Sequence, residues 1–192
     1  FNPRVVYAGT AKGDVLKSLD GGISWKIIHR FENEVMQIFV DQKNDTRIVY
    51  VGTKNKGAWR TPDAGGTWKS SEKALQKYSG AMEFRGMTYH KDRLILATKY
   101  GLLKTTTGEG WANWEPLNLL TAPGTAEIIA LAINPANADE FYYGAGSTLY
   151  HTKDGGATWV AAELPIPSNP TARGVNPEAT ATVYLGLSLP QK

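Results

Sequence analysis

The sequence predicts an all-β fold made of repeated four-stranded antiparallel units. An eight-residue segment recurs intact three times, short β-rich runs recur in step with it, and the composition favours strands and turns. The 192 residues include 20 glycines, 10 prolines, 6 tryptophans and 9 tyrosines, with 42% hydrophobic and 20% charged residues. A chain of this length and balance buries a substantial core, which excludes the disordered, coiled-coil and disulfide-stapled classes.

The recurring segment has the form Ser/Thr-x-Asp-x-Gly-x-Ser/Thr-Trp. Intact copies, named box 1, box 2 and box 4 below, occupy 18–25, 61–68 and 152–159. A degenerate copy at 105–114, box 3, is two residues longer and has Thr107 in place of the aspartate. The copies follow one another at a period of about 45 residues, which is the length of one supersecondary unit in repeat proteins.

Four short β-rich runs are expected in each period. The first run is followed by a second run that ends in a small residue. The third run leads into the box, and the fourth run follows the box tryptophan. First runs lie at 35–40, 82–89, 128–133 and, more weakly, 172–175. Second runs lie at 6–9, 49–52, 94–97, 141–144 and 183–186. Third runs lie at 15–18, 58–61, 102–105 and 149–152, and 25–29 illustrates the fourth. No helix is required, and four-stranded units at this period are typical of the blades of a β-propeller.

The box resembles the Asp-box, or BNR, repeat. This repeat occurs in sialidases, xyloglucan-active glycoside hydrolases, sortilin-type receptor domains and photosystem II assembly factors of the Ycf48 type. The resemblance extends from about Tyr7 to Tyr184. It implies a propeller of six or seven blades and an extracellular, periplasmic or cell-surface location.

The number of second-strand runs bears on how many blades the chain contains. Residues 1–192 are expected to form one propeller segment that covers about four blades. Five second-strand runs exceed what a closed four-bladed ring needs, which favours a part of a larger ring. The alternative is a closed four-bladed ring in which residues 172–175 supply the first strand of the opening blade.

The box residues are expected to hold the scaffold together. A carboxylate in a tight turn accepts backbone N–H bonds, glycine permits positive φ, and tryptophan fills apolar space between strands. The sequence therefore predicts that these residues are structural and not catalytic, with the tryptophans in the core. They are Asp20, Trp25, Asp63, Trp68, Asp154 and Trp159.

Candidate binding residues lie on one face of the predicted propeller. In an antiparallel meander, the loops between second and third strands share a face with the connections between blades, and loops on a rigid scaffold commonly carry binding sites. We expect this loop face to display Lys12, Lys54, Lys56, Lys99 and Tyr100. The lysines would give a weak attraction for anionic partners, although ordinary solvation explains exposed lysines equally well. Glu83 and Arg85 flank Phe84 within the first-strand run at 82–89, and they could form an ion pair or the edge of a polar site.

Several kinds of site are not predicted. The chain has no cysteine, and its three histidines are isolated, so neither a metal site nor a cofactor is expected. The net charge of +3 is spread along the chain, which gives no indication of nucleic-acid binding. No run of 18 apolar residues predicts a transmembrane segment. The sequence does not indicate an oligomeric state.

The favoured function is non-catalytic binding of a protein or glycan through the loop face. A purely architectural module in a larger protein is a related possibility. The alternative is a glycoside hydrolase, sialidase-like or xyloglucanase-like, with part of its catalytic set outside this segment. No arginine lies in the Arg-Ile-Pro context of sialidases, and a carboxylate pair for hydrolysis would have to come from Glu32, Glu34, Glu83 and Asp92.

Overall fold

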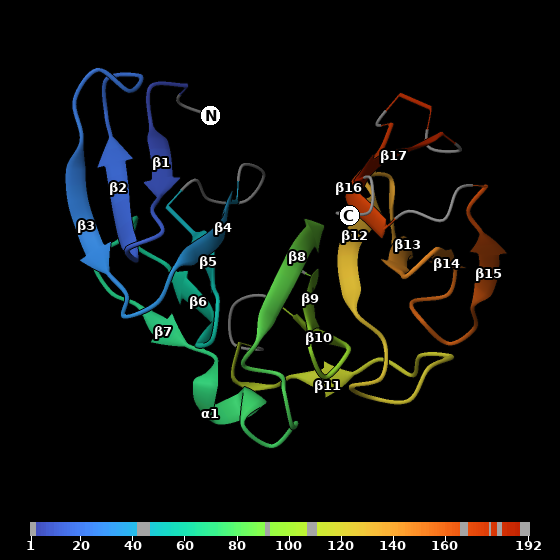
Figure 1. The fold of residues 1–192 in the computed structure, drawn as a ribbon. Helices are drawn as coiled ribbons and strands as arrows, with labels where there is room; N and C mark the ends of the chain where they lie inside the picture. The colour runs from blue at the N-terminus through green and yellow to red at the C-terminus, as the bar shows by residue number, and fades with distance from the viewer. Residues whose placement is uncertain are drawn as a thin grey trace. The chain divides into compact units, whose positions relative to one another are not determined.

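The chain is all-β, and the strands of its described residues form five antiparallel sheets (Figure 1). The computed structural model describes residues 3–41, 47–90, 93–106, 111–165, 169–176, 178–179 and 182–188. In each sheet of the described chain, the strands follow one another in chain order as a meander. This arrangement matches the predicted succession of β-rich runs.

The strand bounds are as follows. The first sheet contains β1 (Val6–Gly9), β2 (Asp14–Ser18) and β3 (Lys26–Arg30). The second contains β4 (Val35–Val40), β5 (Val49–Thr53), β6 (Gly57–Thr61) and β7 (Lys69–Ser70). The third contains β8 (Phe84–His90), β9 (Arg93–Thr98), β10 (Leu102–Thr106) and β11 (Glu115–Pro116). The fourth contains β12 (Ile128–Asn134), β13 (Asn137–Ala145), β14 (Thr148–Thr152) and β15 (Val160–Glu163), and the fifth contains β16 (Asn169–Val175) and β17 (Val183–Ser188).

The central strands are buried because both of their faces are apolar. Every residue of β5 is buried, and the alternation of β5 places Val49 and Val51 on one face and Tyr50 on the other. β5 pairs antiparallel with β6, with Val51 opposite Trp59. A strand covered on both faces is what stacked blades require, and the sequence pattern of these runs predicts it.

One described element, a short helix, was not predicted from the sequence. A single turn, α1 (Glu72–Leu75), follows β7 and places Leu75 in the core with no exposed surface. The Ser70 hydroxyl accepts the Glu72 N–H at 3.0 Å, and the Ser71 carbonyl accepts the Leu75 N–H at 3.0 Å. Serine ahead of a good helix-forming run favours such a turn.

The chain forms two compact units. The first contains residues 1–77 and 82–84, and the second contains 78–81 and 85–192. In the first unit, Val15, Phe31, Val49 and Val51 form a buried cluster that Trp59 and Trp68 extend. The buried cluster of the second unit contains Ile95, Ala97, Leu102, Leu117, Ile128, Phe141 and Tyr143.

The fifth sheet bears on the four-bladed alternative. β16 contains the run at 172–175, and it pairs with β17 along Asn169–Val175. The strand that pairs with β1 in the described chain is β2. β1 belongs to the first compact unit and β16 to the second, so the closed four-bladed alternative stays a prediction.

Candidate functional site

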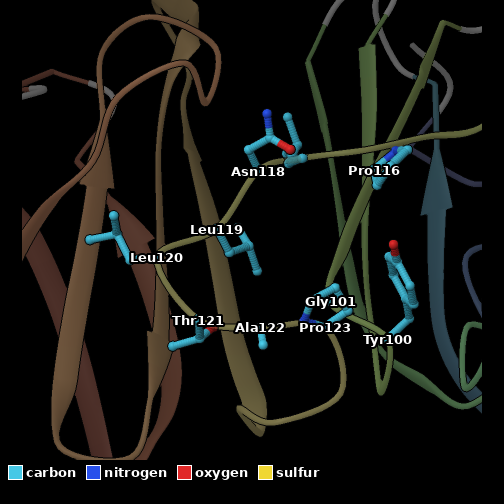
Figure 2. A pocket seen from close by; sticks show the side chains of 10 residues that line it. Tyr100, Gly101, Pro116, Asn118, Leu119, Leu120, Thr121, Ala122 and Pro123 are labelled. Carbon is cyan, nitrogen blue, oxygen red and sulfur yellow. The ribbon is translucent and has the colours of Figure 1, made fainter.

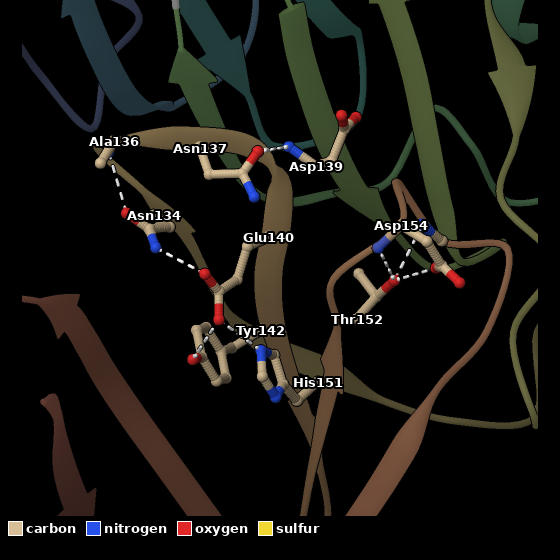
Figure 3. A network of polar contacts seen from close by, with 10 residues as sticks. Asn134, Ala136, Asn137, Asp139, Glu140, Tyr142, His151, Thr152 and Asp154 are labelled. Carbon is tan, nitrogen blue, oxygen red and sulfur yellow. Dashed lines mark hydrogen bonds and ion pairs between the residues drawn. The ribbon is translucent and has the colours of Figure 1, made fainter. Parts of the chain in front are cut away.

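The three intact boxes form closely similar hydrogen-bonded turns. In box 2 the Asp63 carboxylate accepts the Thr67 N–H, the Thr67 hydroxyl and the Thr61 hydroxyl, each at 2.8 Å. The Thr61 hydroxyl oxygen also accepts the Gly65 N–H at 2.8 Å. Equivalent bonds hold Asp20 in box 1, and Figure 3 shows part of the set around Asp154 in box 4. Because its oxygens accept hydrogen bonds from residues of the same turn, the carboxylate stabilises that turn.

These bonds lower the pKa of the box aspartates. The Thr67 N–H is the largest cause at Asp63, followed by the Thr61 and Thr67 hydroxyls, and together they bring the pKa of Asp63 to about 2. The pKa of Asp154 is also about 2, with the Thr158 hydroxyl as its largest cause. The pKa of Asp20 is lowered by the hydroxyls of Ser18 and Ser24 and by backbone N–H groups.

This shift predicts how stability responds to acid. A carboxyl group whose pKa is lower in the folded state than in the unfolded state stabilises the fold above its unfolded pKa, and this stabilisation is lost as pH falls through the folded pKa. The window for Asp63 lies between about 4 and about 2. We expect Asp63→Asn to lower the melting temperature at pH 6 and to flatten its decline from pH 4 to pH 2. Melts over this range check the prediction, and Glu163→Gln on exposed β15 serves as the control. A parallel decline in Asp63→Asn and wild type would contradict it.

The box tryptophans differ in their burial. Trp68 packs against His29 and Phe31, with ring centroids 5.3 Å apart in both cases. Trp159 packs against Tyr143 at 4.9 Å and donates its indole N–H to the Asn118 carbonyl at 2.7 Å. Trp25 is 42% exposed, so the expectation that it lies in the core is wrong. Trp68 contacts His29 of the sheet before its own, and Trp159 contacts Asn118, two residues after the last strand of the sheet before its own. Trp25 belongs to the first sheet described.

Box 3 keeps its tryptophan in the expected place. The Trp114 indole N–H donates to the Trp111 carbonyl at 3.0 Å, just as Trp25 donates to the Gly22 carbonyl at 2.9 Å. Trp114 is buried, with 1% of its surface exposed. Thr107, which replaces the aspartate, lies outside the described residues.

The predicted lysines lie in hairpin loops, as the strand order requires. Lys12 lies between β1 and β2, and Lys54 and Lys56 lie between β5 and β6. Lys54 and Lys56 form ion pairs with Glu34 at 3.4 Å and Glu32 at 4.0 Å. Exposed pairs of this kind are weak, but they reduce the positive potential that the lysines offer to an anion.

The remaining predicted residues are distributed between the two units. Lys99 and Tyr100 lie in the second unit, between β9 and β10, so a joint cluster of the four lysines stays a prediction. Arg85 also belongs to the second unit and pairs with Glu127 at 3.0 Å, while Glu83 precedes β8 in the first unit. Asp92 lies outside the described residues.

A groove in the second unit contains the predicted residue Tyr100. It has a volume of about 420 Å³ and is lined by Tyr100, Gly101 and the connection 116–123, which leads from β11 toward β12. Figure 2 shows this connection leaving at Pro116, turning at Leu120 and returning through Pro123 to the side of Gly101. The groove therefore lies where a hairpin loop meets a connection between blades, the arrangement expected of the loop face.

Backbone hydrogen bonds hold the groove in shape. The Gly124 N–H donates to the Tyr100 carbonyl at 2.9 Å, which ties the end of the connection to the hairpin. Thr98 and Gly101 close the hairpin through reciprocal N–H to carbonyl bonds of 2.9 and 3.1 Å. Gly101 has φ of 144°, a conformation that favours glycine at this tight turn. Walls fixed by backbone bonds lose little entropy when a ligand binds.

The lining of the groove combines apolar and aromatic surface with a few polar groups. The Tyr100 ring lies 5.1 Å from the Tyr78 ring, and the Tyr78 hydroxyl donates to the Trp114 carbonyl at 2.9 Å. Leu120 is 62% exposed beside the groove, and Asn118 supplies an amide. Polar and apolar atoms contribute nearly equal shares of the lining, so a ligand could be held by both hydrogen bonds and apolar contact. The connection 116–123 was not among the predicted site residues, although Pro116 and Pro123, which lie between strand runs, indicate a rigid loop.

A second cavity of about 400 Å³ lies in the same unit. It is lined by Arg93, Lys104, Thr105, Thr106, Asn113 and Glu115. Arg93 forms an ion pair with Asp139 and donates to the Ala138 carbonyl at 3.1 Å, so structural contacts already occupy its guanidinium. The Arg93 guanidinium is therefore less available to a ligand in this cavity than the list of lining residues suggests.

A polar network within the fourth sheet has Glu140 at its centre (Figure 3). The Glu140 carboxylate accepts bonds from the Asn134 amide at 2.6 Å and the Tyr142 hydroxyl at 3.3 Å, and it contacts the His151 ring nitrogen at 2.9 Å. Burial raises the pKa of Glu140, but the hydrogen bonds from Asn134 and His151 outweigh this effect and lower it. The network joins β12, β13 and β14, and both oxygens of the Glu140 carboxylate have partners within it.

No group of three or more histidine, aspartate or glutamate side chains in the described part of the chain could hold a metal ion. Among the same residues, no helix is long and apolar enough to cross a membrane.

No protein-family model matches the chain. A xyloglucanase from Paenibacillus sp is 28% identical over 169 residues, which are 83% of this chain and 14% of that protein. Vacuolar protein sorting/targeting protein 10 from Talaromyces marneffei is 30% identical over 73 residues, 35% of this chain and 5% of that protein. The chain therefore spans only a small part of the length of these relatives.

Solved structures show the likeness in fold. The match to a GH74 enzyme from Niastella koreensis covers 96% of this chain and 33% of the enzyme chain, with a TM-score of 0.76 and 15% sequence identity. The match to YCF48 from Cyanidioschyzon merolae covers 97% of this chain and 68% of the YCF48 chain, with a TM-score of 0.65 and 16% sequence identity. The match to a structure of YCF48 bound to D1 peptide covers 97% of this chain and 73% of that chain, with a TM-score of 0.51 and 17% sequence identity. Together with the sheet order, these likenesses show that the chain is an all-β propeller built of four-stranded antiparallel blades.

Proposed function

We propose that this chain is a non-catalytic propeller that binds a protein or glycan in the groove formed by Tyr100, Gly101 and residues 116–123. The observation that carries the proposal is the groove itself, because its walls are fixed by backbone bonds and present an aromatic ring, exposed leucine and an amide. A flat aromatic ring with nearby amide groups suits either the apolar face of a sugar or an extended peptide. The proposed location is extracellular, periplasmic or at the cell surface.

Two comparisons support the two ligand classes. The structure of YCF48 with a D1 peptide shows that a propeller of similar fold binds a peptide. The xyloglucanase match extends over 83% of this chain and keeps a glycan, and the glycoside hydrolase alternative, in consideration. Against hydrolysis, Glu32 and Glu34, two of the candidate carboxylates, form ion pairs with lysines.

The groove is tested by truncating its exposed ring. We expect Tyr100→Ala to weaken binding by about 10- to 30-fold, the usual effect of removing an aromatic anchor. Binding is measured on immobilised glycan and peptide arrays and then by calorimetry with the strongest array ligand. Tyr184→Ala, which removes a tyrosine that is 61% exposed on β17, is the control and should leave affinity unchanged. Equal losses in both variants, or none in Tyr100→Ala, would overturn the groove as the site.

The hydrolase alternative is tested in parallel with a fluorogenic sialoside and with xyloglucan oligosaccharides. We expect no turnover of either substrate. Turnover that disappears in Glu32→Gln or Glu34→Gln would replace the proposed function with hydrolysis.

We also propose that the loop-face lysines assist the approach of an anionic partner. Replacing Lys12, Lys54, Lys56 and Lys99 together by Glu should weaken binding of an acidic array ligand at low salt and leave the melting temperature within a few degrees of wild type. The effect should shrink as salt rises, because exposed charges are screened. Unchanged binding at low salt would remove these lysines from the proposed site.

A further inference from the structure

The connection 116–123 lines the groove beside Tyr100 with backbone groups that have no partner. Within the described part of the chain, no hydrogen bond forms at the N–H groups of residues 118–122 or at the carbonyls of residues 119–121. Both prolines of the connection lie outside this stretch, so each of its residues keeps its N–H. Water bonds to such groups when the groove is empty, and a ligand with matching groups replaces that water.

Both ends of this stretch are fixed within the second unit. The N–H groups of Leu117 and Gly124 donate to the carbonyls of Leu102 and Tyr100, both at 2.9 Å. The connection that leads to β4 in the first unit is tied to its hairpin in the same way, but only residues 32–34 lie between its two tied points. The longer span in the second unit leaves room for the groove and holds its free groups in place.

Apolar surface forms the floor of the groove. A Cβ added to Gly101 would lie 3.5 Å from the Leu119 Cδ1, so Leu119 lies over the glycine of the hairpin, and it also packs against the buried cluster of the second unit. Figure 2 shows Leu119 directed toward the hairpin that carries Tyr100, and Leu120 directed away from it. The space between Tyr100 and Leu119 therefore suits an aliphatic side chain of a ligand.

The lining also indicates the charge of the ligand. Among the described residues that line the groove, none is an aspartate, glutamate, lysine or arginine. A charged group entering the groove would lose hydration without gaining an ionic partner there. The part of a ligand that occupies the groove is therefore uncharged.

A peptide main chain matches the free groups of this wall better than a glycan does. Each residue of a peptide supplies one N–H donor and one carbonyl acceptor, the same combination that the connection leaves free. Side-chain groups for sugar hydroxyls are fewer, since the lining offers the Asn118 amide and the Tyr100 hydroxyl besides Thr121, whose hydroxyl is buried. The backbone groups therefore favour a peptide as the occupant.

We propose that the groove binds an uncharged, extended peptide segment of a partner protein. The N–H groups of residues 118–122 and the carbonyls of residues 119–121 pair with the peptide main chain, and an aliphatic side chain of the peptide lies between Tyr100 and Leu119. Main-chain pairing supplies affinity, and the apolar contact supplies selectivity. This inference rests on the proposed function, because it names the ligand class and the mode of binding for the same groove.

The proposal is tested with a library of acetylated and amidated heptapeptides of alanine, valine, leucine, threonine and serine, screened against the 192-residue chain. Amide hydrogen exchange then reports on the wall. With the strongest library peptide bound, we expect exchange at residues 118–122 to slow by about tenfold or more, as for amides that enter hydrogen bonds. Exchange at residues 32–34 is the internal control and should not change. Unprotected amides at 118–122 in the peptide complex would overturn the proposal.

Changes to the peptide separate main-chain recognition from side-chain recognition. N-methylation at one residue at a time removes one N–H donor, and at two or more positions it should weaken binding by about tenfold. Replacing the aliphatic side chains of the peptide by aspartate or lysine should also weaken binding, because the lining carries no opposite charge. A peptide that tolerates N-methylation at every position would contradict main-chain pairing and overturn the proposal.

The same variants distinguish this inference from the proposed function. Peptide binding that is weakened in Tyr100→Ala and unchanged in Tyr184→Ala supports both. A neutral glycan whose binding is weakened by Tyr100→Ala, when no library peptide behaves in this way, would keep the groove as the site and overturn the peptide. If Tyr100→Ala alters the binding of neither ligand class, the proposed function fails and this inference fails with it.

Discussion

Replacing Trp68 by Ala should lower the free energy of unfolding by about 3 kcal/mol, near the lower end of the range for truncating a buried aromatic, because Trp68 is only partly buried. The indole ring lies against His29 and Phe31 and belongs to the core cluster around Val49 and Val51. Its loss leaves a cavity between the first and second sheets that the fixed strands cannot close. Chemical denaturation followed by circular dichroism measures the effect.

Two variants separate packing from other causes. Trp25→Ala removes the equivalent residue of box 1 and should cost less than half as much, because Trp25 is 42% exposed. Trp68→Phe should retain most of the stability, since the Trp68 indole N–H has no hydrogen-bond partner in the described part of the chain. If Trp25→Ala and Trp68→Ala cost the same, the box tryptophan would act within its own turn and not between sheets.

The sequence was enough to predict the strands and the boxes because both follow from local chemistry. A period of about 45 residues, alternating apolar runs and glycine-containing turns determine where strands begin and end. The same aspartate bonds recur in boxes 1, 2 and 4 because they involve only neighbours within four residues. α1 was missed because a single helical turn depends on Leu75 entering the core, and no periodic pattern marks it.

The burial of individual side chains could not be predicted in the same way. Trp25 and Trp68 stand at the same position of the same box motif, yet Trp25 is exposed and Trp68 packs on the preceding sheet. Local sequence does not contain this difference, because it depends on which sheet lies next to the box. The same reason explains why Arg85 pairs with Glu127, a residue 42 positions away.

The groove was only half predicted for a related reason. Tyr100 was expected on the loop face from strand order alone. Its opposite wall comes from residues 116–123, whose path depends on the Gly124 bond to the Tyr100 carbonyl and on Leu119 packing against the core. An irregular connection takes its shape from such long-range contacts, and residue-type patterns do not specify it.

The second large effect is expected at Gly13, in the hairpin between β1 and β2. Its φ of 91° favours glycine, and a Cβ there would lie 2.1 Å from the Phe31 backbone carbonyl oxygen. Backbone cannot move aside as a side chain does, and the Gly13 carbonyl also accepts the Phe31 N–H at 2.8 Å. Gly13→Ala must therefore displace the end of β3 and with it the buried Phe31 ring.

We expect Gly13→Ala to destabilise the chain by about 3 kcal/mol or more, combining the cost of a left-handed alanine with that of a steric clash. Gly21→Ala is the matched control, because Gly21 has φ of 78° and an added Cβ there meets nothing within 4 Å. It should cost only about 1 kcal/mol, the conformational part alone. Denaturant titrations give the free energy of unfolding of both variants. The difference between their losses of stability measures the cost of the clash with the Phe31 backbone. Equal losses would mean that the first sheet relaxes around the new methyl group and that Phe31 does not depend on the close approach at Gly13.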